Sequence, residues 1–163
     1  IANPKETWVV HVGDPMTTLQ TLDRQSGAQF PPDAVVENTI VTARRLTDPN
    51  ALTTPLDKYA FIYEWTVSPA QTLKPGTKAI VGVCPDPVEL INVPANEIDS
   101  LLARLVLGHQ KTPATFEVLP RVNIPPEMTL ACGAITSAAI PSPQSVLPVL
   151  TAVRQLMRSA PRL

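Results

Sequence analysis

Few side chains in this chain are suited to catalysis, and they are widely spaced. The sequence has two histidines, His11 and His109, and two cysteines, Cys84 and Cys132. A serine or cysteine nucleophile needs a base beside it, and the spacing gives neither histidine a plausible orienting partner. The sequence lacks the motifs of nucleotide-binding loops, serine hydrolases and zinc proteases. These observations predict that the protein is not an enzyme.

Two carboxylates follow a predicted strand at residues 78–83. They are Asp86 and Glu89, in the sequence Asp-Pro-Val-Glu. Calcium is a hard cation that binds several oxygens, and carboxylates at the end of a strand can share one ion. Asp86 and Glu89 are therefore our candidate metal ligands, with calcium as the candidate ion. The alternative is that both are solvated loop charges.

Three arginines recur every four residues near the C-terminus. We predict a last helix over residues 145–158, with an apolar face that consists of Val146, Val149, Leu150, Val153, Leu156 and Met157. Arg154, Arg158 and Arg162 lie on another face and are the candidate nucleic-acid contacts, because an arginine row can lie along phosphates. The alternative is that cations near a helix C-terminus stabilise the helix dipole.

The clearest periodic signal lies at residues 59–67. Five large apolar residues occupy every second position, which is the pattern of a strand with one buried face: Tyr59, Phe61, Tyr63, Trp65 and Val67. A Pro-Gly turn separates this strand from residues 78–83. We expect further strands at residues 7–12 and 35–46, a long loop at residues 16–33, short strands at 114–119 and 121–124, and a buried strand within 128–139.

A helix is predicted at residues 97–107. Asn96 has the composition of an N-cap, Gly108 that of a C-terminal stop, and the apolar residues between them fall on one helical face. In a β domain, we expect such a helix to cover an open end of the sheets.

The composition indicates one folded domain. The chain has 163 residues, 44% of them hydrophobic, and its 19 prolines separate short apolar runs. That pattern is typical of an all-β sandwich or barrel. No apolar run is long enough to span a bilayer, and the N-terminus lacks a signal-peptide pattern. Two cysteines permit one disulfide, but because both lie in apolar runs we expect buried thiols.

Residues 59–87 resemble the middle of the jelly-roll coat proteins of small icosahedral RNA viruses of the sobemovirus, tombusvirus and tymovirus type. The similarity consists of an aromatic-rich strand, Ser-Pro, a loop with glycine, an apolar strand with Gly-Val, and then Asp-Pro. It implies an eight-stranded sandwich in a virion, copies of the same chain as partners and viral RNA as cargo. It also implies calcium at subunit contacts, with Asp86 and Glu89 in the corresponding place. A basic N-terminal arm is lacking, and the chain ends in a predicted helix.

Together these observations predict a mainly β protein, an antiparallel β-sandwich of jelly-roll type with a covering helix and a C-terminal helix. We expect a single domain over residues 1–163, of which 144–163 form the helical extension. The expected function is a self-assembling capsid protein. The alternative is a β-sandwich recognition module, as in a protruding domain of a virion or a secreted adhesin, that binds a receptor, glycan or protein through its loops.

Overall fold

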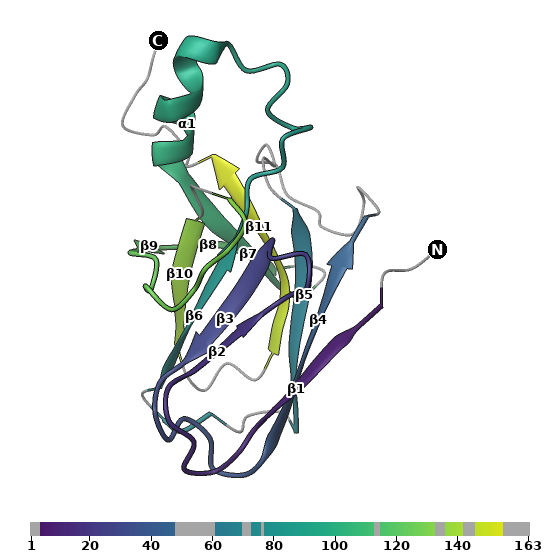
Figure 1. Ribbon diagram of the computed structural model, residues 1–163, viewed down its shortest axis with the longest axis vertical. Coiled ribbons are helices and arrows are strands. Elements are labelled where there is room, and N and C mark those ends of the chain that lie inside the picture. The colour runs from purple at the N-terminus through teal and green to yellow at the C-terminus, as the bar shows by residue number, and fades with distance from the viewer. Residues whose placement is uncertain are drawn as a thin grey trace.

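The protein is mainly β (Figure 1). The computed structural model describes residues 4–47, 61–69, 73–75, 77–112, 115–132, 136–141 and 146–154. Six strands form one sheet, in the order β1 (Glu6–Val10), β4 (Thr39–Leu46), β5 (Ile62–Ser68), β11 (Val146–Arg154), β7 (Leu105–Thr112) and β8 (Thr115–Leu119). Five strands form the other, in the order β2 (Thr17–Gln20), β3 (Ser26–Phe30), β6 (Lys78–Val83), β10 (Thr136–Pro141) and β9 (Arg121–Val122). All pairings within the sheets are antiparallel.

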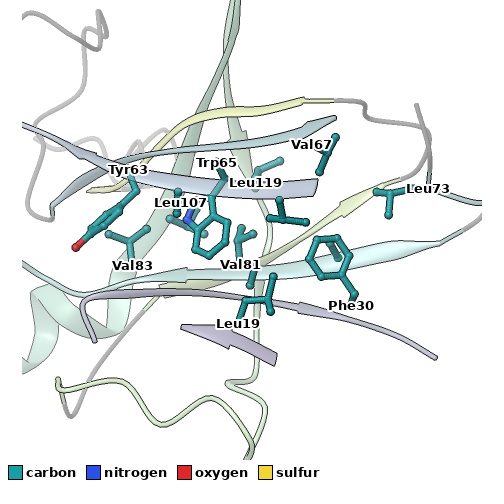
Figure 2. Packing of buried hydrophobic residues seen from close by; sticks show 14 of the residues in the cluster. Leu19, Phe30, Tyr63, Trp65, Val67, Leu73, Val81, Val83, Leu107 and Leu119 are labelled. Atoms are coloured by element: carbon teal, nitrogen blue, oxygen red, sulfur yellow. The ribbon is translucent and has the colours of Figure 1, made fainter. Parts of the chain in front are cut away.

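The two sheets share one hydrophobic core, and β5 supplies its largest side chains. Tyr63, Trp65 and Val67 are buried, and the residues between them are partly exposed. The predicted alternation is therefore confirmed over the described part of this strand. Figure 2 shows these side chains packed against residues of the other sheet, among them Leu19, Phe30, Val81 and Val83.

One polar contact crosses from sheet to sheet inside this core. The indole N–H of Trp65 donates to Ser26 Oγ at 3.0 Å, and the Ser26 hydroxyl donates to the Gly82 carbonyl at 2.8 Å. The Trp65 ring also stacks on Trp8 with 5.5 Å between the ring centroids. The donor of the buried indole is thus satisfied, which removes the desolvation cost of burying it.

The strands from β5 onwards pair in nested order. β7 pairs with β8, β6 pairs with β10, and β5 pairs with β11. The chain therefore runs out along β5, β6 and β7 and returns beside them, as a long hairpin does, and successive nested pairs alternate between the two sheets. The short strand β9 pairs with β10 outside this nesting.

The predicted C-terminal helix is wrong over residues 146–154, which form β11 at the centre of the six-stranded sheet. Backbone pairing with β5 on one side and β7 on the other prevails over the helical spacing of the apolar residues. Pro148 cannot donate to a ladder, and the register with β5 shifts between Leu147 and Leu150, around this proline. The described part of the predicted helical extension, residues 146–154, thus belongs to the sheet.

The predicted helix at residues 97–107 is shorter than expected. A 3₁₀ turn, Ala95–Glu97, leads into α1 (Ile98–Arg104), whose N-cap is Glu97 rather than Asn96. Leu105–Leu107 are buried but extended, because they begin β7 and pair with β11. Within α1, Leu101 is buried and Leu102 packs partly buried against the core, so the apolar face is narrower than the one predicted for a covering helix over residues 97–107. This helix is not long and apolar enough to cross a membrane, nor is any other helix in the described segments.

The predicted loop at residues 16–33 is a hairpin of β2 and β3, and its outer side is covered by a segment that we call the strap, residues 123–132. Figure 1 shows the strap as the green trace between β9 and β10. Gln29 donates to Glu127 at 3.1 Å and Gln20 to Thr129 at 3.3 Å. Every residue of β3 is buried. The strand expected within 128–139 begins only at Thr136.

A disulfide between Cys84 and Cys132 fastens the strap to the end of β6. The expectation of two buried thiols is therefore wrong. The error has a physical reason: 48 positions separate the cysteines, and sequence alone does not show that the strap returns to the strand that Cys84 follows.

Candidate functional site

The two candidate metal ligands lie in a turn directly after β6. Asp86 Oδ1 accepts a hydrogen bond from the Val88 N–H at 2.9 Å, and the Glu89 N–H donates to the Asp86 carbonyl at 3.0 Å. One carboxylate therefore stabilises the turn, and Glu89 is exposed. No group of three or more His, Cys, Asp or Glu side chains suited to a metal occurs in the described segments. Calcium binding by Asp86 and Glu89 stays a prediction.

The candidate nucleic-acid residues are divided by the limits of the described chain. Arg154 is the last residue of β11, where its backbone pairs with Leu105. The helix that would align it with the other two arginines does not exist at this position. Arg158 and Arg162 lie outside the described residues, and RNA binding by the row stays a prediction.

The turn between β2 and β3 is held by a polar network that the sequence did not reveal. Asp23 accepts hydrogen bonds from the hydroxyls of Thr21 and Tyr63, both at 2.6 Å, and from the Gln25 N–H at 3.0 Å. Arg24, at the tip, adopts a positive φ of 57°. Its side chain donates to the Thr129 carbonyl of the strap. The turn is therefore fixed to β5 and to the strap at once.

These contacts shift the pKa values of Asp23 and Tyr63, the pair at the centre of the network. Partial burial raises the pKa of the Asp23 carboxyl, but the hydrogen bonds from Thr21, Tyr63 and Gln25 together outweigh it, and the pKa lies below its usual 3.8. Burial, and then the neighbouring Asp23, raise the pKa of the Tyr63 hydroxyl. Both pKa values move away from neutrality. A general acid or base works best with a pKa near the working pH, so this pair is suited to holding structure or ligand.

A pocket of about 200 Å³ opens beside this network. It is lined by Pro4, Glu6, Leu22, Asp23, Arg45 and Tyr63. Arg45 lies over the Phe61 ring at 4.0 Å from its centroid, and Glu6 accepts a hydrogen bond from the Leu22 N–H at 2.8 Å. The pocket thus combines both signs of charge with apolar walls, which allows binding of a small polar group but supplies no nucleophile paired with a base.

Among the described residues, three large apolar side chains are strongly exposed in this turn and in the segment that follows Cys84. Leu22 is 89% exposed in the turn itself, and Ile91 and Val88 are 73% and 70% exposed in the segment that follows Cys84. The Cys84 N–H donates to the Gln25 carbonyl at 2.8 Å, which joins the two segments. These exposed apolar side chains are candidate contact groups for a partner.

His11 has a partner that the sequence interpretation overlooked. Its backbone N–H donates to Asp14 Oδ2 at 2.8 Å, and its Nδ1 lies 3.5 Å from the same oxygen. The spacing of three residues was visible in the sequence. The pair is exposed and closes the turn after β1, with no third group of a catalytic triad among its described contacts.

Comparison of the chain with protein-family models, with curated proteins and with solved structures finds no match.

Proposed function

We propose that the protein is a structural subunit, a β-sandwich of jelly-roll type that assembles with copies of itself as viral coat proteins do. The observation that carries this proposal is the nested pairing from β5 to β11. A jelly roll is a long antiparallel hairpin rolled into two sheets, and nested pairs that alternate between sheets are its expected pattern. β3 pairs directly with β6 here, so the arrangement is a variant of that pattern.

Assembly needs surface that neighbouring subunits can bury. Leu22, Val88 and Ile91 provide exposed apolar contact groups, and the network around Asp23 holds Leu22 in a fixed turn. A rigid contact group loses little conformational entropy on binding. Under this proposal the protein resides in a virion, calcium at Asp86 and Glu89 would join subunits, and Arg154 with Arg158 and Arg162 would contact viral RNA.

A second candidate function is supported by the disulfide. Cys84–Cys132 favours an oxidising environment, which includes secretion and cell or virion surfaces. A recognition module that works there would use the same fixed turn and the adjoining pocket to bind a receptor, glycan or protein. The two functions differ in the partner: copies of the same chain in one, another molecule in the other.

The mass of the protein in solution tests the proposal. We expect light scattering and electron microscopy to show particles or small oligomers whose size changes with pH and calcium. Leu22→Asp should reduce that association, because it places a charge in the contact. Val36→Asp, at a valine that is 53% exposed and lies outside this turn, is the control for an added charge. A wild-type protein that stays monomeric under every condition contradicts self-assembly and leaves the recognition module.

A further inference from the structure

The outer face of β1, β4 and β5 carries an ordered set of side chains. Across these strands, Val9 lies beside Ile40 and Ser68, and Thr7 beside Thr42 and Thr66. The next pairs along β4 and β5 are Arg44 with Glu64 and Leu46 with Ile62. Val9 and Ile40 are each 45% exposed. The face therefore has apolar side chains at both ends and a charged pair between them. We call it the β4–β5 face.

The charged pair is only partly engaged within the subunit. Arg44 NH2 donates to Glu64 Oε1 at 3.0 Å, and the two side chains are 32% and 29% exposed. The hydroxyls of Thr42 and Thr66 hydrogen-bond to each other one row away. A guanidinium has five N–H donors and a carboxylate accepts several hydrogen bonds. Each partner of the Arg44–Glu64 pair can therefore bind a second group of opposite charge.

The β4–β5 face is complementary to itself. Consider two copies packed face to face, related by a two-fold axis that lies between the facing sheets. If this axis runs parallel to the strands and midway between β4 and β5, it places β4 of one copy over β5 of the other. The register then brings Arg44 opposite Glu64 of the second copy and Leu46 opposite Ile62 of the second copy. The Arg44–Glu64 pair between the copies therefore occurs twice, as an isologous contact requires, and neither Arg44 nor Glu64 lies opposite its own kind.

We propose that the β4–β5 face is a contact between two copies of this chain, packed face to face about that axis. This inference deepens the proposed self-assembly and depends on it, because it names one of the surfaces used. The specific prediction is that Arg44 of each subunit pairs with Glu64 of the other.

The size of the face indicates a weak contact. Strands lie about 4.8 Å apart and rise about 3.3 Å per residue, so the two overlapping strands, of about seven residues each, cover roughly 220 Å² per copy. A standard interface buries about 800 Å² per partner. The contact therefore suits a shell, in which several weak contacts per subunit add up on closure. The exposed charges contribute orientation and specificity more than affinity.

The other sheet does not offer an equivalent face around β3. The strap covers it there, and all five residues of β3 are buried. A second copy could reach that side only by displacing the strap, which the disulfide retains.

Charge reversal in two separate variants tests the contact. R44E makes the pair acidic on both sides and E64R makes it basic on both sides, so each variant alone should lose self-association, with a Kd at least about tenfold weaker. A mixture of R44E with E64R restores both pairs between subunits while like charges remain within each subunit. Association should then return in the mixture, measured by analytical ultracentrifugation at protein concentrations up to about 1 mM.

Two controls keep the outcome interpretable. K78E makes the same change of charge on the five-stranded sheet and should associate as the wild type does. Arg44→Gln removes the charge without repulsion inside the subunit. It should stay folded, as checked by circular dichroism, and should weaken association less than R44E does.

The results separate this contact from the proposed function. A wild type that self-associates, with R44E and Arg44→Gln equally associated, overturns the contact and leaves self-assembly standing. A mixture of R44E and E64R that associates no better than either variant alone also overturns it, because the pair then acts only within the subunit. A wild type that is monomeric at every concentration overturns both.

Discussion

Removal of the Cys84–Cys132 disulfide should destabilise the protein strongly. The bond closes the strap over β3, and no other covalent link joins these segments. We would replace both cysteines by alanine, because a serine at the fully buried position of Cys84 would leave a hydroxyl to be desolvated. The remaining strap contacts, chiefly Gln29 with Glu127 and Arg24 with Thr129, stay in place in the variant.

The magnitude follows from the length of chain that the bond closes. The cysteines are 48 residues apart in the sequence. In the chain-entropy treatment of cross-links, a loop of that length restricts the unfolded state by about 4 kcal/mol at 25 °C. The free energy of unfolding should fall by about that amount, which is a large share of the 5–15 kcal/mol typical of a folded domain.

Urea unfolding of three samples measures this difference. The oxidised wild type should have the highest midpoint, and the reduced wild type and the double alanine variant should share a lower one. With a slope of about 2 kcal/mol per molar urea, the midpoints should differ by about 2 M. The double alanine variant should not respond to reductant, which separates the disulfide from other effects of reduction.

A small difference would refute the reasoning. If oxidised and reduced wild type unfold within about 1 kcal/mol of each other, the strap is held by its non-covalent contacts and the loop is already restricted in the unfolded chain. Peptide mapping without reductant establishes whether Cys84 and Cys132 are linked in each sample.

Three further changes test the interior. Ser26→Ala removes the acceptor of the Trp65 indole N–H and should lower the free energy of unfolding by about 1–3 kcal/mol in urea titrations; an unchanged midpoint would contradict that role. Gly27→Ala places a Cβ 3.1 Å from a backbone carbonyl of β2 that cannot retreat, and should destabilise by about 1–3 kcal/mol. Tyr63→Phe removes a donor that lowers the pKa of Asp23. Because folding lowers that pKa, the ionised Asp23 carboxyl stabilises the folded state above pH 3.8, and this stabilisation is lost as the pH falls through the folded pKa. The variant should therefore lose less stability in acid than the wild type. Thermal melts across pH 2–6 measure this difference.

Strands with one buried face were predictable, and strands with two covered sides were not. Alternation located the buried side of β5, and flanking turns located Lys78–Val83 without error. By contrast, β3 reads Ser-Gly-Ala-Gln-Phe, which is small and polar. It is a strand because β6 pairs with one edge and the strap covers its outer side. Those partners lie more than 50 residues away, where local propensity carries no information.

The C-terminal segment shows how two periods can compete in one sequence. Val146, Val149, Leu150 and Val153 fit a helical face, but the run between them is also apolar at nearly every position, as in central strands. Length alone did not decide between the two. The polar network around Asp23 was not predictable for a similar reason, because the Tyr63–Asp23 hydrogen bond joins residues 40 positions apart. Asp86 and Glu89, adjacent to a predicted strand, were placed correctly after it.

The two sheets differ in how their outer sides are protected, and this difference bears on assembly. Around β3 the strap and the Cys84–Cys132 bond occupy the outer side, whereas the β4–β5 face carries half-exposed side chains among the described residues. A docking partner would have to displace a covalently held segment on the five-stranded sheet, whereas the strap does not cover the β4–β5 face. Self-association through the β4–β5 face should therefore persist after mild reduction, as long as the fold survives. Association that disappears on reduction at a temperature where circular dichroism is unchanged would instead locate the contact at the strap.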